Sequence, residues 1–283
     1  MRQIVETAVA AACIPDAYRD LLCIPLRQRG KVLSGDLEPR WPVLVLAVSV
    51  AVRGPALPAA QVAAAVEVFM AALDVLDDIQ DGDPSPLIDT AGIGQAVGVA
   101  GALLVLAYEL LGRLEEVGLP ADRIPAFIQG LSRCALTAGG GQYLDLASEG
   151  RPDLSLDEAL DIGRRKGGEL AAAACRLGAL VGTQDENELA LYESLGRHLG
   201  TVEQLANDLQ DAAVGAVKTD RERGKRTLPL VYAGARDGRE IDECEAQFFT
   251  RVVMEGERER VREILERLAA RGHAVAALAR LVS

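Results

Sequence analysis

Apolar residues recur at helical spacing along almost the whole chain, and short segments rich in proline and glycine interrupt them. Alanine and leucine dominate, whereas β-branched stretches bounded by turn residues are scarce, so the balance favours helices over sheet. The uninterrupted stretches run to about 20 to 29 residues, against an average helix of about 11 to 12. Such long helices are typical of a bundle with a site in its core, so the sequence predicts an all-α fold.

Short breaker segments place the helices along the chain. The segment 82–86 (GDPSP) is a clear stop, and Ser155 with Glu158 three residues later has the pattern of an N-terminal capping box. No shift in composition and no repeat of fixed period marks a second domain, so we expect residues 1–283 to form one helical domain. The expected helices are 43–52, a long helix ending near 82, 93–116, one from 120 to 148, one from 155, 185–213 and a shorter one from 229.

Composition excludes several classes of function. The chain has 283 residues, 49% of them hydrophobic, and a net charge of -12, which describes an acidic globular protein that repels nucleic-acid phosphates. The five cysteines include no CxxC pair and there are two histidines, so we expect no zinc site and reduced thiols in a cytoplasmic protein. We expect no signal peptide and no stable membrane insertion, because the apolar stretch 42–52 is short and 93–111 is interrupted by polar residues and is predicted as a buried bundle helix.

Two clusters of carboxylates end long apolar helices. In the first, Asp77 and Asp81 lie one turn apart on a single helical face, with Asp78 beside them. Like charges at this spacing and at a helix C-terminus are unfavourable unless cations bind them, although acidic clusters also occur at ordinary surface helix ends. The second cluster, 207–211 (NDLQD), repeats the spacing, so we expect the two to face each other across a cavity and to bind Mg²⁺ together with phosphate oxygens.

A basic run follows the second acidic cluster. It contains Lys218, Arg221, Arg223, Lys225 and Arg226. Such a run is usually a solvated loop, but its position favours a role in holding a departing diphosphate.

Five segments, in order along the chain, resemble the motifs of the trans-isoprenyl diphosphate synthases, the polyprenyl synthetase family. The resemblance covers about residues 30–235. The matching segments are Asp77, Asp78 and Asp81 for DDxxD, 141–145 for GQxxD, Lys166 with Gly167 for the KT lysine, 204–211 for QxxDDxxD with Asn207 in place of the first aspartate, and 225–230 for KxTLP.

The resemblance implies an isoprenoid-synthase-type bundle with a central cavity and a substrate that is an allylic isoprenyl diphosphate. It implies Mg²⁺ as cofactor, three ions once substrate is bound, and a homodimer. The implied catalytic residues are Asp77, Asp78, Asp81, Asn207, Asp208 and Asp211, of which Asp77, Asp81, Asn207 and Asp211 would bind the metal. The diphosphate would contact Lys166, Lys218, Lys225 and Arg226. The cavity would be lined by Phe69, Ala72, Leu73, Gln142, Tyr143, Asp145 and Gln204, with Asp145 orienting a ligand or accepting a proton.

The chain departs from the family at the site for the second substrate, isopentenyl diphosphate. Chain-elongating members carry GGKRxRP early in the chain, but the matching loop here, 34–42, contains Asp36 and Glu38. The arginine pair that follows DDxxD is missing, and Met70 stands where a histidine is usual. Each lost cation removes a charged hydrogen bond of roughly 1.5–3 kcal/mol, so the sequence predicts ionisation of one substrate without chain elongation.

Several readings of the function remain open. Terpene-synthase-type chemistry is favoured by Asn207, though not by Gly215, where that motif has glutamate. The alternatives are a prenyltransferase, either chain-elongating or acting on another acceptor such as a peptide, and a non-catalytic partner subunit. The small Ala72 and the ring of Phe69 in the helix before DDxxD predict a pocket for a C15 or C20 substrate.

Overall fold

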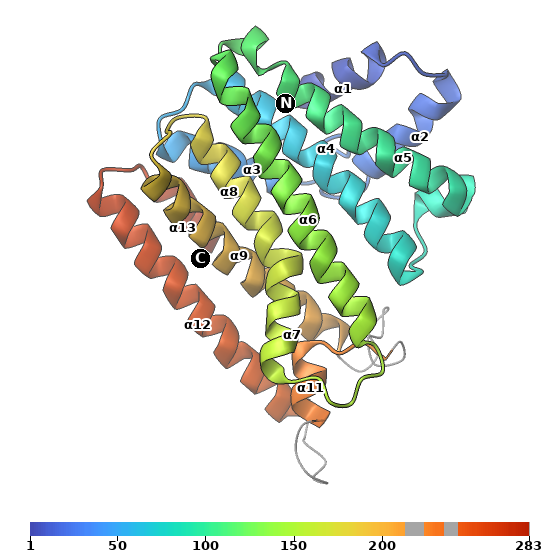
Figure 1. Ribbon diagram of the computed structural model, residues 1–283, viewed down its shortest axis with the longest axis vertical. Helices are drawn as coiled ribbons and strands as arrows, with labels where there is room; N and C mark the ends of the chain where they lie inside the picture. Colours follow the sequence, from blue (N-terminus) through green and yellow to red (C-terminus); the bar gives the residue numbers. More distant parts are fainter. Residues whose placement is uncertain (213–223, 235–242, 283) are drawn as a thin grey trace. The chain divides into compact units, whose positions relative to one another are not determined.

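The computed structural model describes residues 1–212, 224–234 and 243–282, and these residues contain helices and connecting turns but no strand (Figure 1). The predicted all-α fold is confirmed. The chain divides into two compact units, residues 1–131 with 177–189 and residues 132–176 with 190–283. Three helices contribute residues to both units, and a single domain over 1–283 stays a prediction.

The first unit is built around one long apolar helix, α4. Its residues from Val62 to Ala72 are almost entirely buried, because alanine and valine cover every side of the helix and leave no polar face. Helices α3 and α5 pack along it. The elements of this unit are α1 (Arg2–Ala11), α2 (Asp16–Leu26), α3 (Arg40–Ala51), α4 (Ala56–Asp81), α5 (Pro86–Gly112), η1 (Leu114–Val117), η2 (Ala121–Arg123), the start of α6 (Ile124–Ser148), the end of α8 (Glu169–Leu180) and the start of α9 (Glu186–Asp211).

The second unit contains an interrupted helix. Helix α7 begins with the predicted capping box, in which Ser155 and Glu158 exchange hydrogen bonds, and it runs directly into a π-helical turn, η3. The elements of this unit are the end of α6, α7 (Leu156–Gly163), η3 (Arg164–Gly168), the first part of α8, most of α9, α11 (Leu228–Gly234), α12 (Glu243–Ala270) and α13 (Ala276–Val282).

Helix α5 corrects two expectations. It begins at Pro86 and not at residue 93, because Ser85 accepts a hydrogen bond from the Ile88 backbone and proline is favoured in the first turn of a helix; a kink follows at Gly92. It was also expected to be buried, but Ile93, Val97 and Val105 are 58%, 50% and 68% exposed. A helix that is buried on all sides and a helix with one exposed apolar face can have the same apolar sequence pattern. The sequence pattern alone therefore does not distinguish them.

Helices α4 and α5 are both long and apolar enough to span a membrane by length and composition alone. The most apolar window of α4 is 78% buried, as expected for a core helix, while that of α5 is 33% buried. The cysteines have no disulfide partners, and burial raises the pKa of the Cys134 thiol to about 12, so this thiol is unreactive at neutral pH.

Candidate active site

The aspartate-rich end of α4 is fixed by the way the helix stops. Gly82 adopts a left-handed conformation with φ 68°, its N–H donates to the Ile79 carbonyl, and the Asp83 N–H donates to the Asp78 carbonyl at 2.8 Å. This is a Schellman motif, which satisfies the last carbonyls of the helix. Asp77, Asp78 and Asp81 in this last turn are partly exposed, so solvent and ions reach their carboxylates.

A lysine that was not among the predicted site residues pairs with the same helix from the loop after α2. Lys31 donates to Asp74, which stands three residues before Asp77 and therefore on the same face of α4. One residue further along the loop, the Val32 N–H donates to the buried Glu67 at 2.9 Å, and burial raises the pKa of Glu67. The two contacts attach the loop after α2 to α4 and place a cation beside the acidic end of that helix.

The three residues predicted to set pocket depth lie earlier on α4. Phe69 and Ala72 are fully buried in the core of the first unit, and Leu73 is partly exposed. Their contact with a substrate chain stays a prediction.

The motif residues at the acidic end of α9 differ in how deeply they are buried. Asp208 is buried and accepts a hydrogen bond from Gln204 Nε2 at 2.9 Å, one turn earlier on the helix. Asn207 is exposed and Asp211 is partly exposed. The ends of α4 and α9 belong to different units, so their predicted approach across a cavity stays a prediction.

Two lysines meet at one buried carboxylate in the second unit. Lys166 Nζ donates to Asp145 Oδ2 at 2.6 Å, and Lys225 Nζ lies 3.6 Å from the same oxygen. All three side chains are largely buried. The segment before Lys225 is held by a hydrogen bond of 2.9 Å from the Gly150 N–H to the Gly224 carbonyl. The structure therefore brings together three predicted site residues that are far apart in sequence.

Of the other two predicted diphosphate ligands, Arg226 lies within the described residues and Lys218 does not. Arg226 donates an exposed hydrogen bond of 3.4 Å to the Pro152 carbonyl. Lys218, with Arg221 and Arg223, lies outside the described residues.

Glycines bring the backbone that carries Lys166 close to its neighbours. A Cβ on Gly141 of α6 would stand 2.7 Å from Arg165 Cβ and 3.0 Å from the Lys166 nitrogen. A Cβ on Gly167 would stand 2.8 Å from the Gly200 carbonyl oxygen and from Gln204 Cβ, both on α9. These are shorter than any real contact to a Cβ, so α6, η3 and α9 reach this distance only because glycine lacks the side chain.

Residues predicted to line the cavity face different surroundings. Gln142 is 7% exposed and lies on the same side of α6 as Asp145, whereas Tyr143 is 70% exposed. Tyr232, a further aromatic candidate, stacks on Phe249 of α12 with ring centroids 4.1 Å apart. A cavity role for Gln142, Tyr143 and Gln204 stays a prediction.

The donor chemistry fits magnesium that binds together with substrate. In residues 1–212, 224–234 and 243–282, no three His, Cys, Asp or Glu side chains lie close enough to hold a metal ion by themselves. Mg²⁺ is usually bound by one or two carboxylates, with water and phosphate oxygens completing its octahedron. Asp77 and Asp81, partly exposed on one helical face, are donors of that kind.

Comparison with known proteins places this arrangement in a family. A family model described as polyprenyl synthetase matches residues 40–268. Geranylgeranyl diphosphate synthase of Mycobacterium tuberculosis is 32% identical over 201 residues, which cover 67% of this chain and 56% of that protein. The short chain isoprenyl diphosphate synthase of Methanothermobacter thermautotrophicus is 30% identical, over 68% of this chain and 61% of that protein. The chain thus spans a little over half the length of these curated relatives.

Solved structures share the fold. The polyprenyl synthetase from Streptomyces coelicolor A3(2) superposes with a TM-score of 0.79 at 24% identity, covering 99% of this chain and 95% of that one. The geranylgeranyl pyrophosphate synthetase of Geoglobus acetivorans gives 0.74 at 24% identity, over 94% and 88%. The fold is therefore that of the isoprenoid synthases. With the family model covering most of the chain, this protein belongs to the polyprenyl synthetase family.

The names of these relatives bear on the predicted reaction. They are prenyl diphosphate synthases, which favours the prenyltransferase alternative. The main prediction, ionisation without chain elongation, is not confirmed.

Proposed function

We propose that this protein is a magnesium-dependent prenyltransferase that ionises an allylic isoprenyl diphosphate and joins the prenyl group to isopentenyl diphosphate. The observation that carries the proposal is the cluster of Lys166 and Lys225 on Asp145. Two largely buried ammonium groups lie at one carboxylate, so the cluster gathers several N–H donors in one place. A diphosphate is an anion that such donors can bind, and lysine is a common phosphate ligand.

In this proposal the aspartates and Asn207 bind the metal, and the basic residues bind the diphosphate. Asp77, Asp81, Asn207 and Asp211 would hold Mg²⁺, three ions in the full complex, while Asp78 and Asp208 support these positions. When bound, the metal neutralises the diphosphate and makes it a better leaving group. Lys166 and Lys225, with Lys218 and Arg226, bind the departing diphosphate, and Asp145 keeps the first two lysines in place. We propose a C15 or C20 allylic substrate and a cytoplasmic location.

Ionisation without elongation is the second candidate, because specific observations favour it. The loop that would bind isopentenyl diphosphate carries Asp36 and Glu38, and the segment after Asp81 has no arginine. Lys31, placed beside α4 by Asp74, supplies one cation near this region and weakens the objection to elongation.

We also propose that a second copy of the chain covers the open face of α5. Val97 and Val105 share this face with Gly94 and Gly101. All four residues are exposed, so an apolar surface along α5 is accessible to solvent. Exposed apolar patches of this kind mark protein or membrane contacts. Helix α5 contains no basic residue, which favours a second copy of the same surface over an anionic membrane.

A product assay tests the reaction. Purified protein with Mg²⁺ would be given geranyl, farnesyl or geranylgeranyl diphosphate, each with and without isopentenyl diphosphate, beside the Asp77→Ala variant as a control. A longer diphosphate formed only with isopentenyl diphosphate supports the proposal. A hydrocarbon or alcohol formed without it replaces elongation by the second candidate. Absence of any product in all mixtures points to another acceptor, such as a peptide, or to a non-catalytic partner subunit.

A further inference from the structure

A buried carboxylate outside all the family motifs holds the turn that carries Lys166. Glu257 on α12 accepts a hydrogen bond from Arg164 Nη2 at 2.8 Å and also pairs with His198 Nδ1 on α9. Burial acts to raise the pKa of Glu257, but the hydrogen bonds from His198 and Arg164 outweigh it and hold the pKa below its ordinary value. Glu257 is therefore ionised at neutral pH and anchors two other elements to α12.

Arg164 and Lys166 project to opposite sides of the same turn. They are two residues apart in η3, and two residues correspond to about half a turn of a π-helix. On one side Arg164 reaches Glu257 of α12, and on the other Lys166 reaches Asp145 of α6. A rotation of the turn that releases one contact therefore displaces the other.

The turn η3 also packs closely against a third neighbour, α9. A Cβ on Gly168 would stand 2.9 Å from Thr201 Oγ1, and Gly167 already lies against Gly200 and Gln204 of α9. With the backbone in contact with α9, the remaining freedom is rotation about the helix axis, and the salt bridge from Arg164 opposes it.

We propose that Glu257 is a positioning residue, which acts through Arg164 to orient Lys166 and thereby sets the affinity of the site for diphosphate. The inference rests on the proposed function, because it assumes that Lys166 binds that anion. It assigns α12 a role in substrate binding although no residue of this helix belongs to a motif of the site.

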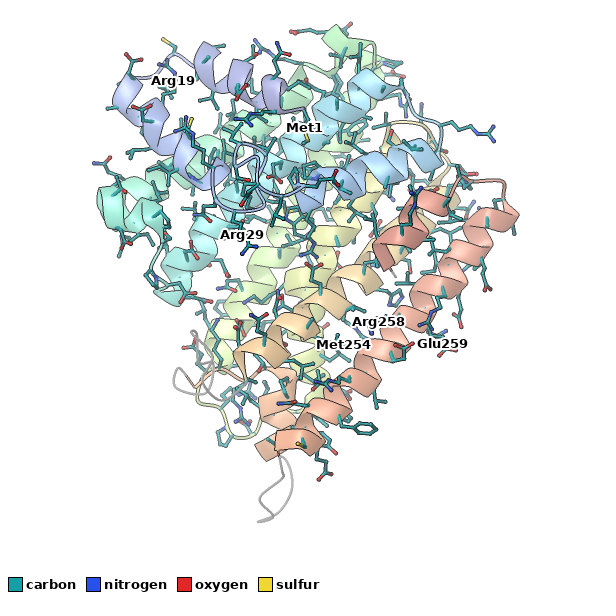
Figure 2. All side chains as sticks on the ribbon, turned by 180° about the vertical axis from the view of Figure 1, so that it is seen from behind. Met1, Arg19, Arg29, Met254, Arg258 and Glu259 are labelled. Carbon is teal, nitrogen blue, oxygen red and sulfur yellow. The ribbon has the colours of Figure 1, made fainter. Side chains whose placement is uncertain are left out.

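Helix α12 also supplies a matched control. Glu257 and Glu259 both line a hollow of about 360 Å³, which Arg164 and His198 of other elements share. Glu259 is exposed, on the outer side of α12 away from Met254, which is buried (Figure 2). The change Glu259→Gln removes the same charge from the same helix and the same hollow without touching Arg164.

The experiment is a double-mutant cycle on the binding of inorganic diphosphate with Mg²⁺, measured by titration calorimetry. Lys166→Ala should weaken binding roughly 10- to 100-fold, as expected for one charged hydrogen bond, while Lys225 maintains measurable affinity. Glu257→Gln should weaken it roughly three- to tenfold, and the double variant should bind no more weakly than Lys166→Ala alone. Glu259→Gln should match the wild type. Arg164→Gln, at a partly exposed position, should reproduce the effect if Glu257→Gln folds poorly.

The outcomes separate the two hypotheses. Additive losses in the double variant would mean that Glu257 acts on the whole structure and not through Lys166, and would overturn the inference while leaving the proposed function standing. The same follows if Glu257→Gln and Arg164→Gln bind diphosphate as the wild type does. A folded wild type that binds no diphosphate overturns the proposed function itself.

Discussion

At the scale of single residues, carboxylates of the same chemistry differ in their surroundings. Asp77 and Asp81 are partly exposed at a helix end, Asp145 is buried between two ammonium groups, and Glu257 is buried between a guanidinium and an imidazole. The first pair was predictable, because its spacing on one helix is local. The partners of Asp145 and Glu257 are distant in sequence. Lys166 was identified through the family resemblance alone, whereas Lys225 was also indicated by the basic run after the second acidic cluster. The pairing of Arg164 with Glu257 has no local signal in the sequence.

Removing one of the proposed metal-binding carboxylates should abolish turnover and leave the fold intact. Asp77→Ala or Asp81→Ala takes away an oxygen donor at a partly exposed helix end, where like charges repel. We expect the rate to fall by roughly 100-fold or more, with helical content and melting temperature unchanged or slightly raised. Steady-state kinetics at saturating Mg²⁺ with circular dichroism measures both, and Asp89→Ala, in the exposed first turn of α5, is the control. Retained activity in both variants contradicts the metal assignment.

Glu257 should contribute stability that disappears in acid. Its pKa is lowered in the folded state, so its ionised form stabilises the protein above the ordinary carboxyl pKa and the contribution is lost as the pH falls through the lower folded value. We expect Glu257→Gln to reduce the free energy of unfolding by roughly 1–3 kcal/mol at neutral pH, since Arg164 is partly exposed. Urea unfolding at about pH 7 and about pH 4 measures the difference. A deficit that is equal at both pH values would rule out the charge pair as its source.

At the scale of helices, the sequence predicted most starts and stops well, with the start of α5 as the exception, and it did not predict the exposed face of α5. The stop at Gly82 and the capping box at Ser155 are encoded by a few adjacent residues, and both occur as expected. The interruption by η3 was not predicted, because α-helical and π-helical turns have the same residue preferences. The open face of α5 was not predicted either, since what covers an apolar helix depends on elements elsewhere in the chain.

Two adjacent glycines of α6 should respond oppositely to alanine. A Cβ on Gly140 meets nothing within 4 Å, so Gly140→Ala should be neutral or stabilise by about 0.5–1 kcal/mol through the helix preference of alanine. A Cβ on Gly141 would stand 2.7 Å from Arg165, so Gly141→Ala should destabilise by about 1–3 kcal/mol.

Chemical denaturation of the two variants beside the wild type gives both values. Gly141→Ala should also weaken diphosphate binding, because it pushes against the turn that holds Lys166. Equal stabilities for the two variants would show that α6 and η3 separate freely, contrary to the close packing described.

At the scale of the whole molecule, α5 is the element whose surroundings are incomplete. Its most apolar window is 33% buried, although its mean hydropathy of 1.8 is close to the 1.7 of the core helix α4. Standard interfaces between proteins bury about 800 Å² on each partner, and a helix of this length can supply much of such an area. In the proposed dimer, the second copy would bury the apolar face of α5, which we expected from the sequence to be buried within one chain.

A charge on the open face of α5 should separate the two copies. We expect the wild type to be a dimer by size-exclusion chromatography with light scattering, and Val97→Asp to shift it to monomer at micromolar concentration. The control is Leu57→Asp, which changes an isolated exposed apolar residue at the start of α4. A wild-type monomer, or one that floats with lipid vesicles, would contradict the proposal.

The π-helical turn between α7 and α8 has a consequence for how this segment tolerates changes in length. Each helical residue advances the phase of the helix by about 100°. Deleting one residue from Arg164–Gly168 would allow a continuous α-helix and would turn the rest of α8 by about that angle against α7. The glycine contacts with α9 and the direction of Lys166 would be lost together, although no charge and no apolar residue need change. Insertions and deletions are thus excluded from these five positions more strictly than most substitutions.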